Sequence, residues 1–269
     1  MLDNPRPTSL NAILANARER VTALRVRAAE LERAAADGPT VRPFPGDVGR
    51  TVGLIAEVKR RSPSQGAIRA DLDPVGHARA YVRGGALAVS VLTDEKHFGG
   101  TLEDLSRVAA AVSVPVLRKD FILDELQIME ARAAGASAVL LIARAVSPDQ
   151  LHSLAAAART WGLATLVEVH AEAELEAALA TRPNVLGVNA RDLSTFALDM
   201  RGAEQIVSRV PRGVTVVAES GVERRADVER LALAGADLVL VGTSVARSDD
   251  PEQTVRALVG VRRETGARR

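Results

Sequence analysis

The sequence predicts an α/β fold in which eight β-strands, each followed by a helix, close into a barrel with a helical extension before it. From Leu54 onward, short runs rich in Val, Leu and Ala alternate with helical patterns, which is typical of parallel strands covered by helices. Three of these runs follow the same Gly-Ala pair, at Gly85, Gly135 and Gly235, so the unit repeats. Eight such units over roughly 215 residues fit a (β/α)8 TIM barrel, whose usual size is about 250 residues.

The first element in the chain is the helical extension. Apolar residues from Leu10 to Ala36 recur at helical spacing, with Arg and Glu between them. Asp37-Gly38-Pro39 ends this pattern, and Phe44-Pro45-Gly46-Asp47 is typical of a linker. We therefore expect residues 1–48 to form an N-terminal helical extension and residues 49–269 to form the barrel as a single catalytic domain.

The strands and helices of the barrel follow in order. The strands are expected at residues 54–59, 87–92, 114–119, 138–142, 164–169, 185–189, 214–219 and 238–242. Helical patterns come between them, for example at residues 74–82, 124–134 and 223–234. A doubly wound open sheet is the alternative fold. It would suit a dinucleotide, but no Gly-x-Gly-x-x-Gly follows the first strand, so no cofactor is expected.

Composition excludes several classes of function. The chain of 269 residues contains no cysteine, which rules out disulfides and thiolate nucleophiles and is typical of a reducing cytoplasm. A net charge of +1 predicts no nucleic-acid partner. The N-terminus is polar, and no run of about 18 apolar residues occurs, so we expect a cytoplasmic protein with no membrane partner.

Polar residues end the predicted strands, where barrel enzymes place their chemistry. These residues are Glu57, Lys59, Lys119, Glu168, Asn189, Arg191 and Glu219. Only three of the 35 basic residues are lysines, and two of the three occupy strand ends. Ion pairing between Lys and Glu at strand ends is the structural alternative. A set of ammonium and carboxylate groups facing one cavity instead predicts shifted pKa values and acid–base chemistry.

Aromatic side chains and glycines mark two further parts of the same face. Phe98, Phe121 and Phe196 follow three of the strands, and together they predict a slot for a planar apolar group, although each could be a loop anchor. The loops after the last two strands contain Glu219-Ser220-Gly221 and Gly242-Thr243-Ser244. Glycine lets backbone N–H groups approach an anion there, so these loops predict a phosphate site, with simple turn chemistry as the alternative.

Metal binding is a competing use for Glu57, Glu168 and Glu219. The histidines lie at positions 77, 97, 152 and 170, the first and third in predicted helices and His97 in a predicted loop. None of them forms a His-x-His or His-x-x-x-His pair. Two lysines in the cavity would also repel a divalent cation. No metal is therefore expected.

Several ordered motifs make the sequence similar to the indole-3-glycerol-phosphate synthase family, the barrel enzymes of tryptophan biosynthesis. The resemblance is carried by residues 55–64, 91–93 with 98–100, 115–121, 166–170, 187–193 and 218–221. It implies closure of 1-(2-carboxyphenylamino)-1-deoxyribulose 5-phosphate, an anionic aromatic sugar phosphate, to indole-3-glycerol phosphate, with loss of carbon dioxide and water.

The resemblance also implies roles for individual residues. Lys119 would be a general acid and Lys59 a second acid, while Glu168 would serve in dehydration, Glu57 would orient Lys59 and Glu219 would brace the site. The expected substrate-binding residues are Ser62, Phe98, Phe121, Leu140, Asn189, Arg191 and Ser220, and the expected phosphate-binding residues are Gly221, Gly242 and Thr243. We expect a monomer, with a weak dimer as the alternative.

Two other functions suit the same barrel. A desolvated lysine can attack a carbonyl, as in a Schiff-base sugar-phosphate aldolase. A non-catalytic phosphate-binding barrel would need the anion site but would not need two lysines and three glutamates in one cavity.

Overall fold

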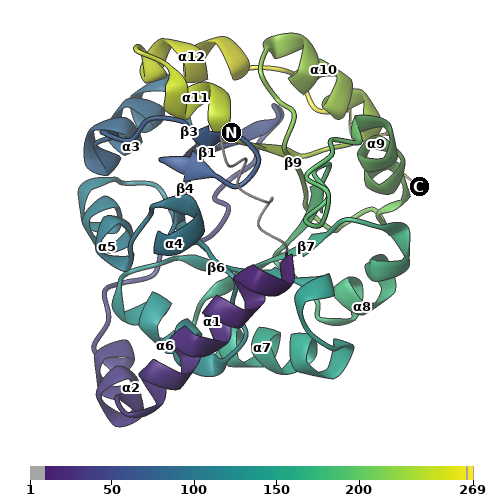
Figure 1. The fold of residues 1–269 in the computed structure, drawn as a ribbon. Helices are drawn as coiled ribbons and strands as arrows, with labels where there is room; N and C mark the ends of the chain where they lie inside the picture. The colour runs from purple at the N-terminus through teal and green to yellow at the C-terminus, as the bar shows by residue number, and fades with distance from the viewer. Residues whose placement is uncertain (1–9, 265, 269) are drawn as a thin grey trace, which may run out of the picture.

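A closed parallel barrel of eight strands forms the centre of the molecule in a computed structural model, which describes residues 10–264 and 266–268 (Figure 1). The strands are β1 (Gly53–Val58), β4 (Ala88–Leu92), β5 (Val116–Lys119), β6 (Ala138–Ile142), β7 (Ala164–Val169), β8 (Val185–Asn189), β9 (Val216–Glu219) and β10 (Leu238–Val241). Strand β1 pairs with both β4 and β10, which closes the barrel. The (β/α)8 prediction is therefore confirmed, and the open sheet is wrong.

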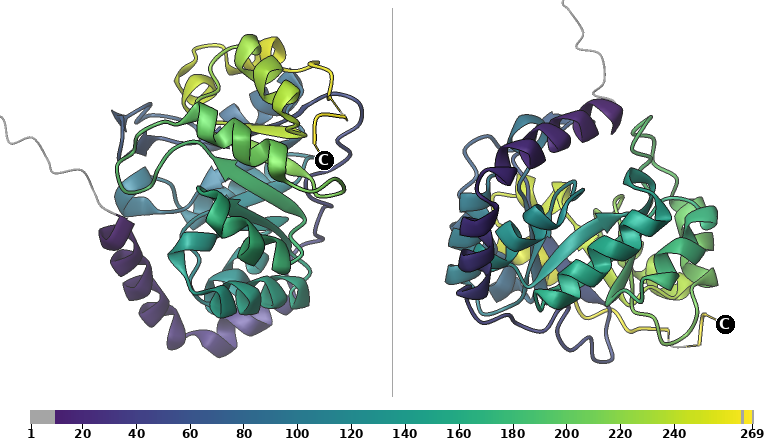
Figure 2. Two further views of the ribbon diagram at one scale, coloured as in Figure 1. Left: turned by 90° about the vertical axis from the view of Figure 1, so that its right-hand side faces the viewer. Right: turned by 90° about the horizontal axis from the view of Figure 1, so that it is seen from below.

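One longer helix follows each strand and lies outside the barrel (Figures 1 and 2). These helices are α3 (Pro74–Gly84), α5 (Leu102–Ala111), α6 (Glu125–Ala133), α7 (Pro148–Thr160), α8 (Leu175–Ala180), α9 (Met200–Arg209), α10 (Arg225–Ala234) and α12 (Pro251–Leu258). The loops on the carboxyl side of the strands also contain α4 (Glu95–Phe98), α11 (Thr243–Arg247), the 3-10 turns η1 (Ala143–Ala145) and η2 (Glu172–Glu174), and the hairpin β2 (Arg61–Ser62) and β3 (Gly66–Ala67). No helix in the described part of the chain is long and apolar enough to span a membrane.

Local sequence signals explain where the elements begin and end. Asp73 and Ser147 accept hydrogen bonds from the first turns of α3 and α7, and Pro occupies the first position of both helices. Gly85 and Gly235 end α3 and α10 with positive φ values of 103° and 101°. Strand β5 begins two residues later than expected because Pro115 has no N–H to donate to a neighbouring strand.

Alternation along each strand separates two apolar cores. Residues such as Leu54, Ala56 and Val58 face outward and pack against the helices. Ile55, Leu117 and other inward-facing residues fill the barrel interior. Successive inward positions are two residues apart, so Glu57 follows Ile55 and Lys119 follows Leu117 on the inward face. Both lie at the carboxyl ends of their strands. The apolar interior therefore ends in a polar mouth.

The N-terminal extension comprises α1 (Leu10–Arg25) and α2 (Ala28–Ala36), which contact α6 (Figure 1). Ile13, Leu14 and Ala17 of α1 are buried in the same apolar cluster as Phe121. The extension is helical, as the sequence predicts, and it shares the barrel core. The division at residues 48 and 49 stays a prediction.

Candidate active site

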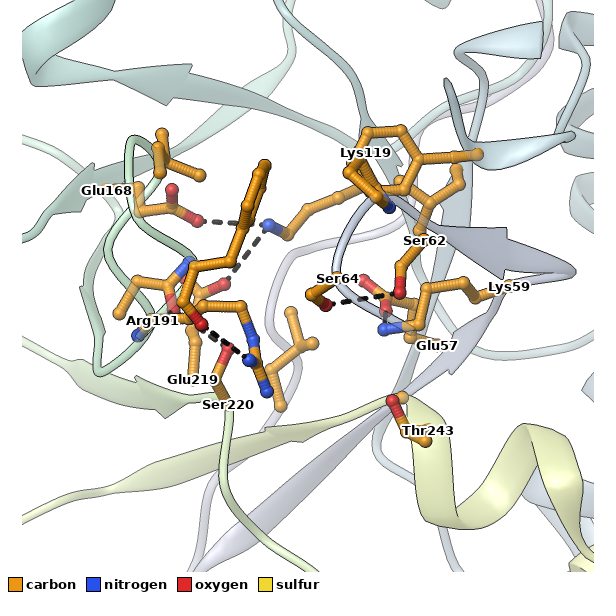
Figure 3. Close-up of a pocket in the computed structure, with 18 of the residues that line it drawn as sticks. Glu57, Lys59, Ser62, Ser64, Lys119, Glu168, Arg191, Glu219, Ser220 and Thr243 are labelled. Carbon is orange, nitrogen blue, oxygen red and sulfur yellow. Dashed lines mark hydrogen bonds and ion pairs between the residues drawn. The ribbon is translucent and has the colours of Figure 1, made fainter. Parts of the chain in front are cut away.

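The mouth of the barrel holds a cavity of about 160 Å³ at the carboxyl ends of the strands (Figure 3). All fifteen residues that the sequence places in the site line this cavity. They are Glu57, Lys59, Ser62, Phe98, Lys119, Phe121, Leu140, Glu168, Asn189, Arg191, Glu219, Ser220, Gly221, Gly242 and Thr243. The expectation that the strand ends converge on one mouth is thus confirmed.

The two lysines of the cavity have different partners. Lys59 lies beside Glu57 of its own segment, with Nζ 2.7 Å from Oε1. Lys119 lies between two carboxylates from other strands, with Nζ 3.0 Å from Oε2 of Glu168 and 3.2 Å from Oε2 of Glu219 (Figure 3). The side chain of Lys119 is 13% exposed, so its ammonium group can face a bound molecule.

Glu168 and Glu219 share Lys119 but have opposite pKa shifts. Burial opposes ionisation of Glu168, but Lys119 and His170 outweigh it and lower the pKa of Glu168 to about 2. Burial and the adjacent Glu168 raise the pKa of Glu219 well above its usual value, against the opposing charge of Lys119. Burial would lower the pKa of Lys119, yet Glu168 and Glu219 raise it. The trio therefore combines one carboxyl group whose pKa is lowered with a second carboxyl group and an ammonium group whose pKa values are raised.

Two glycines make room for these charged groups. A Cβ atom at Gly242 would collide with the carboxylate of Glu57 and the ammonium of Lys59. A Cβ atom at Gly187, an inward position of β8, would collide with the carboxyl group of Glu219. Gly242 therefore leaves space for Glu57 and Lys59, in addition to lying in the loop predicted to bind phosphate.

One side of the cavity is suited to an anion. Ser220 has a positive φ of 70°, and its hydroxyl donates a hydrogen bond to Oδ1 of Asn189 over 2.9 Å. The Arg191 guanidinium donates to the carbonyl of Phe196 over 3.0 Å, and burial lowers the pKa of Arg191. Among the described residues, no carboxylate forms an ion pair with Arg191. Its positive charge is therefore available to a bound anion.

Another part of the cavity is aromatic. The rings of Phe98 and Phe121 have centroids 6.3 Å apart and are tilted by 35°. Leu140 and Phe196 also line the cavity. Phe196 has a positive φ of 58°, which is rare for a bulky residue and is often found at ligand-binding positions. These residues form the apolar surface that the sequence predicts.

Sequence reasoning missed several polar residues near this site, of which Asp94, Asp120 and His170 are buried in whole or in part. Asp94 and Asp120 line the cavity and are buried, and their positions directly after Thr93 and Lys119 were the available signal. His170 was considered only as a metal ligand, yet its Nε2 lies 3.3 Å from Oε1 of Glu168. The prediction that His97 lies in a loop is wrong, because it belongs to α4, where Asp94 accepts a hydrogen bond from its backbone N–H. No group of three or more His, Asp or Glu residues within 10–264 and 266–268 could hold a metal ion.

Comparison with known proteins agrees with this geometry. Residues 10–258 match the family model described as indole-3-glycerol phosphate synthase. The protein of that name from Rhodopirellula baltica is 46% identical over 236 residues, covering 87% of this chain and 91% of the relative. A second, from Streptomyces coelicolor, is 48% identical over 234 residues, covering 86% and 90%. A third, from Desulfosudis oleivorans, is 43% identical over 257 residues, covering 93% and 98%.

A solved structure of low sequence identity has the same fold. Thiamine phosphate pyrophosphorylase from Pyrococcus furiosus matches with a TM-score of 0.58 at 17% identity, covering 77% of this chain and 93% of that one. At this identity the match concerns the fold alone. The family match includes every strand of the barrel, and the three relatives each extend over most of the chain. The chain therefore belongs to the indole-3-glycerol phosphate synthase family.

Proposed function

We propose that Lys119 is the general acid of the ring closure and that Glu168 is its ionised partner. The activity is that of the family, a carboxy-lyase reaction that forms indole-3-glycerol phosphate. The observation that carries the assignment is the position of the Lys119 ammonium between Glu168 and Glu219 in a cavity that aromatic side chains and Arg191 also line. Lys119 is the cavity lysine with two carboxylate partners, which keep its proton in place until the substrate binds.

The proposed sequence of steps uses each group once. Lys119 gives a proton to the ketone oxygen as the carboxyl-bearing ring carbon attacks the ketone carbon. Departure of carbon dioxide leaves its bonding electrons to the ring, which becomes aromatic again. Loss of the new hydroxyl group as water then needs an acid for the oxygen and a base for the adjacent CH₂ proton. Lys59 is the second acid and Glu168 the base, while Glu57 orients Lys59 and Glu219 braces Lys119.

The same cavity orients the substrate. Ser220, Gly221, Gly242 and Thr243 hold the phosphate, whose charge suits the backbone N–H groups of the last two loops. The sugar hydroxyls and the carboxylate of the substrate lie near the polar side of the cavity. The residues assigned to that side are Asn189, Arg191 and Ser62.

The aniline ring lies in the aromatic part of the cavity. Phe98, Phe121 and Leu140 flank it there. This arrangement would hold the ring carbon close to the ketone, which reduces the entropic cost of the attack.

Charge argues against the aldolase alternative. A Schiff-base lysine must lose its proton before it attacks a carbonyl, so its pKa must fall. Glu168, Glu219 and Glu57 instead raise the pKa of Lys119. Borohydride should therefore trap no adduct when it is added with the carboxyphenylamino substrate, whereas an aldolase would be labelled and inactivated.

The decisive experiment compares two lysines. Lys119→Ala should lower kcat about 10²- to 10⁴-fold in an assay of indole-3-glycerol phosphate formation, because it removes the proton donor. Lys96 is exposed on α4 and absent from the cavity, so Lys96→Ala is the matched control and should keep wild-type turnover. Wild-type turnover in Lys119→Ala would exclude this residue as the acid.

We also propose that the enzyme is a monomer and lies in the cytoplasm. A monomer suits this function because one chain supplies every residue that we assign to the reaction, so the proposed steps need no second subunit. A cytoplasmic location, expected from the lack of cysteine, would place the enzyme beside its small-molecule substrate.

A further inference from the structure

We propose that His170 is a positioning residue that holds the Glu168 carboxylate ionised and aimed at Lys119. It would act as a neutral imidazole that donates from Nε2. The inference rests on the function proposed above for Glu168 and Lys119. It assigns a role to a residue that lies behind the cavity surface and does not line the cavity.

Geometry places Glu168 between two nitrogen atoms. Its Oε2 accepts a hydrogen bond from Nζ of Lys119 over 3.0 Å, and its Oε1 lies 3.3 Å from Nε2 of His170. The side chains of Glu168 and His170 are each 1% exposed, so water competes little for the carboxylate. Lys119 therefore holds one oxygen of the carboxylate, and the other oxygen faces the ring nitrogen of His170, from which a hydrogen bond would keep the first directed at the ammonium.

His170 itself has few other interactions. Both ring nitrogens are buried, and within the described residues neither makes a hydrogen bond in this resting arrangement. On its far side, Nδ1 lies 4.0 Å from Oε2 of Glu174, which instead accepts the backbone N–H of His170. Burial of a polar nitrogen without a hydrogen-bond partner costs free energy. A small movement would let Nε2–H donate to the carboxylate of Glu168 and remove this cost.

Burial of the ring favours its neutral form. Burial lowers the pKa of His170, and Arg144 and Lys119 act in the same direction against Glu168 and Glu174. Arg144 pairs with Glu174 over 2.9 Å, so this carboxylate is already compensated.

The cavity on the α9 side of His170 adds further carboxylates. It is lined by Glu172, Asp192 and Asp199, and Arg144 also pairs with Asp192. A neutral ring with Nε2–H stabilises the ionised form of Glu168 without cancelling its charge, as a base requires.

Substitution of the ring by Gln or Leu tests the role of the donor. In His170→Gln the amide N–H occupies a position similar to Nε2–H, whereas His170→Leu fills the space without a donor. We expect His170→Leu to lower kcat about 10- to 100-fold with KM little changed, as for a lost hydrogen bond to a charged group. The acid limb of its kcat/KM profile should also move to higher pH, because the pKa of Glu168 rises when its donor is lost. His170→Gln should restore most of kcat and return the acid limb.

A double-mutant cycle separates this role from simple packing. In a Glu168→Gln background, His170→Leu should cause little further loss, because its effect passes through the carboxylate. An equal loss in both backgrounds, a change in KM alone, or a His170→Gln variant as impaired as His170→Leu would each overturn the proposal. His152→Leu, at an exposed position of α7, is the control for loss of a histidine, and thermal unfolding checks that every variant is folded. Wild-type turnover in Glu168→Gln alone would instead contradict the proposed function of Glu168.

Discussion

At the scale of single residues, the site depends on two glutamates that differ in charge although they share one lysine. Glu168 is within 3.3 Å of both Lys119 and His170, and these neighbours keep it ionised. Glu219 is buried to 2% exposure in its side chain and lies next to Glu168, which favours its protonated form. Two carboxylates in one site cannot both ionise without a large cost, so environment assigns them different states.

This difference predicts how stability changes with pH. The folded-state pKa of Glu219 is above its unfolded value, so its contribution to stability is complete below about pH 4 and is lost as pH rises through the folded pKa. Glu219→Gln cannot ionise and should become steadily more stable relative to wild type between about pH 4.5 and 8, as measured by urea unfolding.

Glu168→Gln is the comparison variant, because its own carboxylate titrates in a different pH window. The pKa of Glu168 is lowered to about 2, so its contribution to stability is lost only as pH falls below about 4. Between pH 5 and 8, Glu168→Gln should follow the trend of Glu219→Gln more weakly, because loss of the Glu168 charge lowers the pKa of Glu219. A flat difference for Glu219→Gln over the same range would contradict the raised pKa of Glu219.

A second prediction at this scale concerns Gly242. Its substitution by Ala would push a methyl group into the ends of the Glu57 and Lys59 side chains, which are flexible and can move aside. We expect Gly242→Ala to lower kcat/KM about tenfold or more through misplaced charges, while the unfolding midpoint changes little. Gly266→Ala, where a Cβ atom would meet nothing within 4 Å, should leave both unchanged. A large loss of stability with normal kcat/KM would contradict this view of Gly242.

At the scale of elements, Arg20 adds a charged contact between the helical extension and the mouth to the apolar packing of α1. Arg20 of α1 donates to both carboxylate oxygens of Asp120, at 3.0 and 2.7 Å, and lies 3.5 Å from Asp94. Asp120 directly follows Lys119, and it also accepts hydrogen bonds from Thr93 and Arg118. Burial would raise the pKa of Asp120, but Arg118 and Arg20 hold it well below its usual range. The extension thus neutralises buried charge beside the site.

Loss of this contact should loosen α1. Arg20→Ala leaves Asp94 and Asp120 with less positive charge, and we expect a loss of about 1–3 kcal/mol in the free energy of unfolding, since Arg20 is partly exposed. Amide hydrogen exchange should also increase in α1 more than in the strands. Arg27→Ala removes an exposed pair with Glu30 and should show no resolvable change. Equal effects for the two arginine variants would exclude a special role for Arg20.

At the scale of the whole molecule, the barrel brings together groups that are far apart in the sequence. Glu57 and Gly242 are separated by most of the chain, yet β1 and β10 are neighbours and their ends meet. The sequence predicts this meeting because βα repeats imply a closed barrel. The structure has that barrel, and the predicted strand-end residues line one cavity. Local patterns could not predict the pairing within the mouth, since Lys119 could have met Glu57, Glu168 or Glu219.

The sequence by itself determined the eight strands, the helical extension and the inward positions of Glu57, Lys119, Glu168 and Glu219. It could do so because alternation along a strand and helical periodicity are local properties of the chain. Tertiary structure alone decided that Glu168 and Glu219 share Lys119, that His170 lies behind Glu168, and that Arg20 reaches Asp120. These contacts join residues from different strands and helices, and the charge of each group depends on its burial and neighbours, which no local pattern contains.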